Sequence, residues 1–350
     1  MECADPGAGH GARRPRHPRQ LHDPGLGQDQ ARRHRRAALA GAGGRDHPVA
    51  GRWRRRDRQV LQGQGGFPVV KAPNLFVIGA PRCGTTSLFA ALKQHPDVYA
   101  TVLKEPHFYA ADLPAQPHTV SDPADYQRLF AAAGDQRYRA EASVWYFYSQ
   151  EAPARIARAH PDARIVLLLR SPADMLLSLY ALYLRTGNEA DSNPEAAVFR
   201  TSEARFANTY FPFGLHYLNL LDVTGPLSRW RSFFPRERLR VLTYEDMYAS
   251  PQAGFRDLCG WLGIDQEAPV SFDARQAREA VRRMATKQLR DLPDHLRRKL
   301  NPAASRLHAG KADVAIPAAL RTRLRHHAQE RNAGFALAAD RPWPDAWRAA

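Results

Sequence analysis

The stretch Asn74-Leu-Phe-Val-Ile-Gly-Ala-Pro-Arg-Cys-Gly-Thr-Thr-Ser87 decides the fold of this chain. A short apolar run leads into a Gly-x-x-x-x-Gly loop, and the loop opens into an amphipathic segment. A strand that turns through glycines into a helix N-terminus forms a cradle for phosphate, because backbone N–H groups and the positive end of the helix dipole point at the anion. The stretch therefore predicts an α/β fold with a phosphate-binding loop.

The loop departs from the ATP-binding type at one position. The spacing of Gly79 and Gly84 matches that type, which then continues with Lys and Ser or Thr. Here Thr85 stands at the lysine position, and the nearest cation is Arg82 inside the loop. We therefore expect a phosphate-containing ligand other than Mg-ATP. A tight turn that binds nothing is the alternative on geometry alone.

A second segment, Lys104-Glu-Pro-His-Phe-Tyr109, follows the loop after one helix and one turn. This connection returns the chain to the edge of the sheet that carries the loop, and it places Glu105 beside the phosphate cradle. An alcohol is a poor nucleophile at neutral pH, and a positioned carboxylate can remove its proton. The alternative is a solvated Lys–Glu pair followed by aromatic core residues.

A third segment, Arg164-Ile-Val-Leu-Leu-Leu-Arg170, reads as a fully buried parallel strand. Ser171-Pro172 then opens a helix. Arg170 therefore lies at the C-terminal edge of the sheet, where ligands bind in open α/β folds, and its guanidinium suits phosphate. Ser178 lies about two helical turns further on. A strand-end salt bridge for Arg170 and a surface role for Ser178 are the alternatives.

In this order the three segments resemble the sulfotransferases that use the donor 3′-phosphoadenosine 5′-phosphosulfate (PAPS). Their donor motif corresponds to Pro81-Arg-Cys-Gly-Thr-Thr86, and the resemblance extends to both the glycan or heparan type and the tyrosylprotein type. It covers about residues 72–347. It implies a P-loop-NTPase-like three-layer α/β sandwich, in which a central parallel sheet is flanked by helices.

The resemblance also implies an in-line transfer of the sulfuryl group from PAPS to a hydroxyl of a glycan, glycoconjugate or small molecule. Glu105 would be the general base, and Arg82 would stabilise charge on the departing phosphate. His107 would be a second acceptor contact, a packed ring or the alternative base. No metal is expected. The residues implied to bind the donor are Arg82, Cys83, Gly84, Thr85, Thr86, Ser87, Arg170 and Ser178.

Two other functions stay open at this point: a P-loop kinase-like phosphotransferase and a non-catalytic nucleotide- or glycan-binding protein. One departure from the resemblance concerns the acceptor. The segment Glu141-Ala-Ser-Val-Trp-Tyr-Phe147 has Ala142 where relatives carry Lys, so either another cation serves or the acceptor differs. The aromatic residues of this segment either stack on the acceptor or form a core layer.

The net charge of +16 is spread unevenly over the 350 residues. Residues 1–70 carry 14 Arg and 6 acidic residues, and therefore contribute half of the net positive charge. Residues 1–66 lack apolar periodicity and predict a disordered tail, or a translated stretch upstream of the true start. Residues 67–350 form the expected sulfotransferase domain, whose basicity suits an anionic donor. No nucleic-acid-reading motif is found, so no specific nucleic-acid partner is expected.

The apolar runs are shorter than the ~20 residues that span a bilayer, and the N-terminus lacks a signal-type apolar region. The three cysteines, Cys3, Cys83 and Cys259, show no metal-ligand spacing. We therefore expect a cytoplasmic, bacterial protein without a transmembrane anchor. Cys83 is either a thiol activated by Arg82 and a helix N-terminus or a small residue in a tight turn.

The remaining patterns predict the following elements. Strands are expected at 74–79, 98–101, 137–142, 165–169 and 239–244, and helices at 85–94, 123–133, 215–234 and 251–262, with a closing amphipathic helix within 317–347. Residues 185–213 are expected to form a lid or acceptor loop, with Arg205, Tyr210 and Phe211 as candidates. The Arg-rich segment 275–311 receives no assigned residue.

Overall fold

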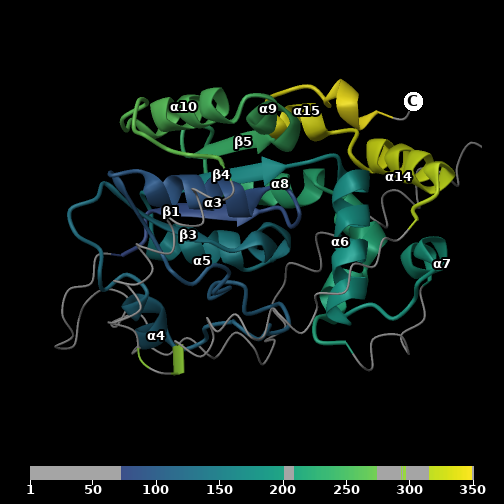
Figure 1. The fold of residues 1–350 in the computed structure, drawn as a ribbon, viewed down its shortest axis with the longest axis horizontal. Helices are drawn as coiled ribbons and strands as arrows, with labels where there is room; N and C mark the ends of the chain where they lie inside the picture. The colour runs from purple at the N-terminus through teal and green to yellow at the C-terminus, as the bar shows by residue number, and fades with distance from the viewer. Residues whose placement is uncertain (1–71, 201–208, 274–292, 294, 297–314, 349–350) are drawn as a thin grey trace, which may run out of the picture. The chain divides into compact units, whose positions relative to one another are not determined.

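The computed structural model describes residues 72–200, 209–273, 293, 295–296 and 315–348 (Figure 1). These residues form a five-stranded sheet in the order β2-β3-β1-β4-β5, and every neighbouring pair is parallel. The expected central parallel sheet is thereby confirmed. Its strands are β1 (Leu75–Gly79), β2 (Val98–Ala100), β3 (Tyr138–Ala142), β4 (Arg164–Leu169) and β5 (Leu239–Thr243).

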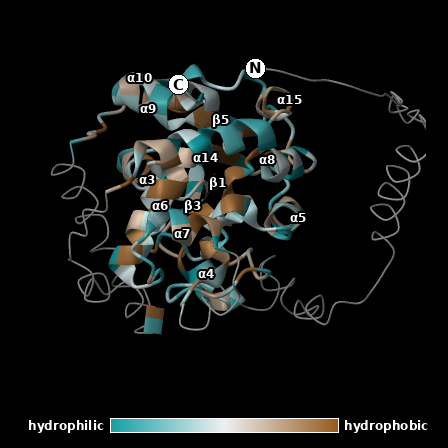
Figure 2. Cartoon of the chain, turned by 90° about the vertical axis from the view of Figure 1, so that its right-hand side faces the viewer, coloured by the Kyte–Doolittle hydropathy of each residue, from teal (hydrophilic) through white to brown (hydrophobic). Residues whose placement is uncertain are grey.

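Helices cover both faces of the sheet. Figure 2 shows α3 on one side of the strands and α5 and α8 on the other. The α-helices are α3 (Thr85–Gln94), α4 (Pro123–Arg128), α5 (Ala152–Ala159), α6 (Pro172–Thr186), α7 (Pro194–Phe199), α8 (Thr224–Arg231), α9 (Tyr244–Ala249), α10 (Pro251–Leu262), α14 (Ala318–Arg331) and α15 (Phe335–Ala339). Short 3₁₀ turns are η1 (Val144–Tyr148), η3 (Pro212–Leu215), η4 (Tyr217–Leu221) and η5 (Asp345–Trp347).

The central strands β1 and β4 are almost entirely apolar because helices cover the sheet on both sides. All five residues of β1 are buried, and so are the last five of β4. A strand with only one covered face would instead alternate between apolar and polar residues. Hydrophobic residues, brown in Figure 2, gather on these central strands.

The order of the strands creates a crevice beside β1. The chain passes from β1 outward to β2, returns through β3 to one side of β1, and then crosses to β4 on the other side. Gly79 at the end of β1 is in register with Leu167 of β4. The loop after β1 and the residue after β4 therefore emerge next to each other. Ligands of open α/β sheets bind at such a reversal of strand order.

Two of the expected helices are shorter than predicted. The segment expected to be helical at 123–133 ends as α4 at Arg128, because Leu129 and Phe130 turn into the core through i−3 hydrogen bonds. In the segment 215–234 only α8 is α-helical, and 3₁₀ turns precede it. Within the described ranges, no helix combines the length and apolar character that crossing a membrane requires.

The tail expected at 1–66 lies outside the described residues, and so does the Arg-rich segment 275–311 except for residues 293 and 295–296. The division of the chain into a tail and a domain starting at residue 67 therefore stays a prediction.

One buried amide fixes where α8 begins. The Oδ1 atom of Asn332 accepts hydrogen bonds from the backbone N–H groups of Val223 and Thr224 and from the Thr224 hydroxyl, each at 2.9 Å. Its Nδ2 group donates to the carbonyl oxygens of Leu221 and Ala328, at 2.7 and 2.6 Å. The side chain is thus fully used, and it joins the end of α14 to the start of α8.

The Asn332 connection predicts a large loss of stability on truncation. Asn332→Ala removes the partner of five hydrogen bonds and leaves buried backbone groups unpaired, which costs about 2–4 kcal/mol. Chemical denaturation of the purified variant measures this loss. The matched control is Gln329→Ala, an exposed residue of the same helix, which is expected to unfold at the wild-type denaturant concentration. Equal unfolding midpoints for Asn332→Ala and wild type would contradict the assignment.

Candidate active site

A cleft of about 1300 Å³ opens at the C-terminal edge of the sheet. All five strands contribute residues that directly follow them, from Pro81 after β1 to Tyr244 after β5. Helix α6 forms a further wall. The lining residues are Pro81, Arg82, Gly84, Thr85, Thr86, Leu103, Lys104, Glu105, Gln116, Pro117, His118, Val144, Trp145, Arg170, Ser178, Leu179, Leu182, Tyr183, Arg185, Thr186, Tyr210 and Tyr244.

The loop between β1 and α3 needs glycine at position 84. Gly84 has φ of 86°, and a Cβ atom there would lie 2.5 Å from the ring of Tyr248. The Tyr248 hydroxyl donates to the Gly84 carbonyl oxygen at 2.7 Å, which holds the loop against α9. No side chain caps the start of α3. Its first N–H groups are therefore available to an anion, as the loop motif predicts.

Positive charge is concentrated on one side of the cleft. The Nε–H group of Arg82 donates to Ser178 Oγ at 3.1 Å, which brings the loop into contact with α6. Burial lowers the pKa of Arg82, and the nearby charges of Arg185 and then Arg170 lower it further. These guanidinium groups repel one another, and their combined positive charge attracts an anionic ligand.

Arg170 occupies the position that the strand pattern predicts. It follows β4, and its guanidinium lies 4.9 Å from the centre of the Tyr244 ring, which follows β5. This cation–π contact holds the arginine at the cleft without consuming its N–H donors. Ser178 lies on α6, whose N-terminus is capped by Ser171. Arg170 and Ser178 thus line the same cleft as the loop.

Glu105 faces the guanidinium groups from the loop after β2. Its carboxylate lies 2.6 Å from the ammonium of Lys104 and 3.6 Å from the His107 ring, and the side chain is 25% exposed. Burial by itself would raise the pKa of Glu105. The charge of Lys104 and the interactions with His107 outweigh burial and hold the pKa below the usual glutamate range. Glu105 is therefore an ionised carboxylate at neutral pH.

His107 lies behind Glu105 rather than on the wall of the cleft. The residue is 4% exposed, it is absent from the lining, and its ring meets Tyr146 edge-on at 6.2 Å. Within the described residues neither ring nitrogen has a hydrogen-bond partner. Among the roles expected for His107, a packed ring beneath the site agrees best with this position.

Left-handed backbone is concentrated at the cleft. Four non-glycine residues among those described have positive φ, and three of them are Arg82 at 60°, Glu105 at 66° and His107 at 49°. The fourth is Asp340 near the C-terminus. A side chain in this region costs about 1–3 kcal/mol and persists where surrounding contacts enforce it, as at functional sites.

Two other residues of the loop motif point away from the cleft. Burial raises the pKa of the Cys83 thiol well above its usual value, and its Sγ donates to the Pro81 carbonyl oxygen at 3.3 Å. The thiol is therefore a small packed group in the turn and not an activated nucleophile. Ser87 is absent from the lining, and its side chain is hydrogen-bonded to Tyr248.

The cleft also contains residues that the sequence patterns did not single out. Arg185 follows Ser178 by seven positions on α6, hence on the same face of the helix about 10.5 Å further along. Helical spacing measured from Ser178 would have found it. Lys104 and Tyr183 line the cleft as well. Tyr183 meets Tyr210 edge-on at a ring distance of 6.5 Å.

The region 185–213 is only partly the expected loop. Helix α6 continues to Thr186 and α7 interrupts the rest, while Arg205 lies outside the described residues. Tyr210 does line the cleft, and its hydroxyl lies 2.9 Å from that of Thr186. Phe211 is fully buried, with its ring 4.8 Å from that of Trp145. Phe211 as an acceptor contact was therefore wrong, because the residue belongs to the core.

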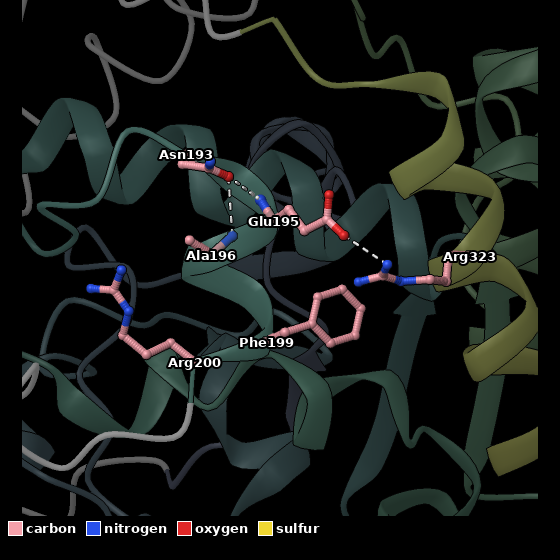
Figure 3. Close-up of a pocket in the computed structure, with 6 residues that line it drawn as sticks. All are labelled: Asn193, Glu195, Ala196, Phe199, Arg200 and Arg323. Atoms are coloured by element: carbon pink, nitrogen blue, oxygen red, sulfur yellow. Dashed lines mark hydrogen bonds and ion pairs between the residues drawn. The ribbon is translucent and has the colours of Figure 1, made fainter.

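A second, shallower hollow lies between α7 and α14 and measures about 530 Å³ (Figure 3). Several of its polar groups are paired across or beside the hollow, and Arg200 pairs with Asp191 outside it. Asn193 Oδ1 caps α7, and Glu195 accepts from Arg323 at 2.7 Å. The Arg323 guanidinium also stacks on the Phe199 ring at 3.8 Å. The hollow therefore joins α7 to α14 through these contacts.

Within the described ranges, no group of three or more His, Cys, Asp or Glu side chains is arranged to hold a metal ion. The cleft instead combines cations, backbone N–H groups and one ionised carboxylate.

Known proteins are similar to part of this chain in sequence. Heparan sulfate glucosamine 3-O-sulfotransferase 3A1 of Mus musculus is 27% identical over 195 residues, which cover 55% of this chain and 46% of the mouse protein. Carbohydrate sulfotransferase 15 of Mus musculus is 26% identical over 231 residues, covering 50% of this chain and 40% of that protein. The chain thus spans less than half the length of these two relatives.

A solved bacterial structure agrees over nearly its full length. The sulfotransferase from Alicyclobacillus acidocaldarius superimposes with a TM-score of 0.54 and 29% identity, covering 65% of this chain and 97% of that one. The family model described as "Sulfotransferase domain" matches residues 72–304, which include the loop after β1, Glu105, Arg170 and Ser178. On this match, and with the parallel sheet and cleft described above, the chain belongs to the sulfotransferase domain family.

Proposed function

We propose that this protein transfers the sulfuryl group of PAPS to a hydroxyl group of an acceptor. One observation carries the proposal. The uncapped start of α3, Arg82 and Arg170 line the same cleft as the ionised carboxylate of Glu105. The reaction needs cations and N–H groups to bind a donor with several negative charges. It also needs a base nearby to remove the proton of the acceptor.

The donor half of the cleft suits the phosphates of PAPS. We assign the 5′-phosphosulfate to the loop, where Gly84, Thr85 and Thr86 supply N–H groups and hydroxyls. Arg170 and Ser178 are assigned to the 3′-phosphate. The guanidinium of Arg170 keeps its donors for such a ligand because its described contact is to the face of Tyr244. Thr85 in place of the lysine disfavours Mg-ATP as the ligand.

The reaction we propose is an in-line displacement at sulfur. The acceptor oxygen forms a bond to sulfur, and the bond from sulfur to the bridging phosphate oxygen breaks. The electron pair of that bond leaves with adenosine 3′,5′-bisphosphate, and Arg82 stabilises the charge that develops on the phosphate. Glu105 takes the proton of the acceptor. Because a hydroxyl oxygen bonded to sulfur is strongly acidic, a carboxylate of low pKa is a sufficient base.

The acceptor half of the cleft combines aromatic rings with cations. Trp145, Tyr183 and Tyr210 lie on its walls together with Lys104 and Arg185. The names of the two mouse relatives indicate carbohydrate acceptors, and we extend this class to the present chain as a glycan or glycoconjugate. A small-molecule alcohol fits the aromatic walls equally. Lys104 and Arg185 are the cations that can serve in place of the lysine missing at Ala142.

Donor binding is predicted to depend on Arg170. Arg170→Ala leaves a bound phosphate without its charged partner, so the Kd for adenosine 3′,5′-bisphosphate is expected to rise about 10- to 100-fold. A thermal-shift titration of the full chain measures it, since saturation at 100 times Kd adds about 2.7 kcal/mol. Arg164→Ala, at the opposite end of the same strand, is the matched control and should retain the wild-type Kd.

The same titration separates the candidate functions. Stabilisation of the wild type by the bisphosphate and not by Mg-ATP supports the donor assignment. Stabilisation by Mg-ATP alone would replace the sulfotransferase proposal with a kinase-like one. An unchanged Kd in Arg170→Ala would refute the placement of the 3′-phosphate.

Glu105→Gln is predicted to abolish most of the turnover while donor affinity is kept. The amide retains the size of the carboxylate but cannot accept the proton, so kcat is expected to fall about 10²- to 10⁴-fold. Transfer of ³⁵S from labelled PAPS to desulfated heparan sulfate, chondroitin and simple aryl alcohols provides the assay. Wild-type turnover in this variant would exclude Glu105 as the base.

The pH dependence of turnover is predicted to respond to Lys104. In the wild type the lowered pKa of Glu105 keeps the base ionised, so no acid limb from this residue is expected between pH 5 and 8. Lys104→Gln removes the largest contribution that lowers the pKa, so the pKa of Glu105 is higher in the variant than in the wild type. Protonation inactivates the base, so kcat of the variant should decline as the pH falls through the raised pKa. Superimposable pH profiles of variant and wild type would argue against this coupling.

A further inference from the structure

A buried carboxylate lies beneath the loop that carries Glu105. Glu141, near the end of β3, has no exposed surface. Its Oε1 atom accepts a hydrogen bond from the Ser143 hydroxyl at 2.6 Å, and its Oε2 atom accepts one from the Tyr126 hydroxyl. The Tyr146 hydroxyl lies close enough to this carboxylate to lower its pKa. Three hydroxyl groups therefore surround one carboxylate that does not reach the cleft.

Two of these hydroxyls hold the backbone of the Glu105 loop. The N–H group of His107 donates to Ser143 Oγ at 3.0 Å. The N–H group of Tyr109 donates to the Tyr146 hydroxyl at 3.1 Å. Because the Ser143 hydroxyl donates its own proton to Glu141, its lone pairs are free to accept from the loop. The carboxylate thus orients the Ser143 hydroxyl towards the His107 N–H group, and the neighbouring Tyr146 hydroxyl accepts from Tyr109.

Further contacts join the same loop to strand β3 and to helix α4. The N–H group of Glu105 donates to the carbonyl oxygen of Ala142 at 2.7 Å. The Phe108 ring stacks on the Tyr126 ring, with centroids 4.1 Å apart and planes 7° from parallel. The loop is therefore held at 105, 107, 108 and 109. Residues 105 and 107 are the two whose backbone is left-handed.

We propose that Glu141 is a positioning residue, which acts through the hydroxyls of Ser143 and Tyr146 to hold the loop backbone in the conformation that presents Glu105 to the cleft. The inference rests on the proposed function, because the loop conformation matters for catalysis only if Glu105 is the base. We call the three side chains, Glu141, Ser143 and Tyr146, the hydroxyl relay.

The cost of the arrangement supports a role beyond packing. Burial raises the pKa of Glu141 to about 7, and the hydrogen bonds from Ser143, Tyr126 and Tyr146 oppose that rise. Removing a carboxylate from water is expensive, and well-packed apolar groups of the same volume are often as stable. Glu105 and His107 have left-handed backbone, which is unfavourable for residues with a side chain and needs surrounding contacts to hold it. The hydroxyl relay supplies such contacts.

The first test is amide hydrogen exchange at single-residue resolution in the full chain. Ser143→Ala is expected to speed exchange at the His107 amide, and Tyr146→Phe at the Tyr109 amide, each about tenfold or more. Tyr148→Phe is the matched control. It removes a buried hydroxyl from the same 3₁₀ turn, but that hydroxyl donates to Leu220 at 2.8 Å, away from the loop. Unchanged exchange at both loop amides would overturn the relay.

The second test separates positioning from general stability. With the ³⁵S assay, Ser143→Ala and Tyr146→Phe are expected to lower kcat about 10- to 100-fold, because small displacements of a reacting group are costly. The Kd for adenosine 3′,5′-bisphosphate should stay at the wild-type value in both. Tyr148→Phe should keep the wild-type kcat. Equal kcat values for Tyr146→Phe and Tyr148→Phe, in an active wild-type background, would refute the positioning role.

The two tests distinguish failure of this inference from failure of the proposed function. If the wild type transfers no sulfuryl group to any of the acceptors, the proposed function fails, and amide exchange alone decides the relay. If Tyr146→Phe does not fold, Ser143→Ala answers the same question through the hydrogen bond to the His107 N–H group. Loss of donor binding in parallel with kcat would show a structural role and overturn the proposal.

Discussion

All five strands of the sheet are parallel, and this constraint determines where the rest of the molecule can place its chemistry. Parallel strands end on the same edge, so the segments that follow β1 to β5 meet there although they are far apart in sequence. The reversal of strand order beside β1 then leaves room between neighbouring connections. The cleft is a direct consequence, since each strand contributes the residues that directly follow it.

The cleft owes its chemistry to an imbalance of charge. Arg82, Arg170 and Arg185 are close enough for the last two to lower the pKa of the first, and one carboxylate, Glu105, faces them. The positive charges of these arginines repel one another, and a bound anion offsets this repulsion. The same cations keep a nearby carboxylate ionised. A polyanionic donor and a proton acceptor are thereby accommodated in one space.

Backbone conformation is enforced from outside the cleft. The loop at Gly84 is held by Tyr248 of α9, and the loop at Glu105 is held by the end of β3. Helix α6, which carries Ser178, is held near its N-terminus because Asp174 accepts hydrogen bonds from Arg325, at 3.2 Å, and from Arg321. Residues that never meet a ligand thus determine where the ligand-facing groups lie.

The sequence by itself determined the strands, the glycine loop and the edge at which Arg82, Glu105, Arg170 and Ser178 meet. These features follow from local signals that can be recognised without a structure: apolar runs, glycine spacing and the position of a residue at a strand end. It did not determine the break of the expected helix before α8, which follows from a hydrogen bond to Asn332, about one hundred residues away.

Only the tertiary structure decided which motif residues face the cleft. Cys83 and Ser87 belong to the loop motif but turn to Pro81 and Tyr248, and His107 packs on Tyr146. It also revealed Arg185 and the hydroxyl relay under Glu105. The physical reason is that side-chain direction, burial and hydrogen bonding between distant segments depend on how elements pack, and no local pattern encodes that packing.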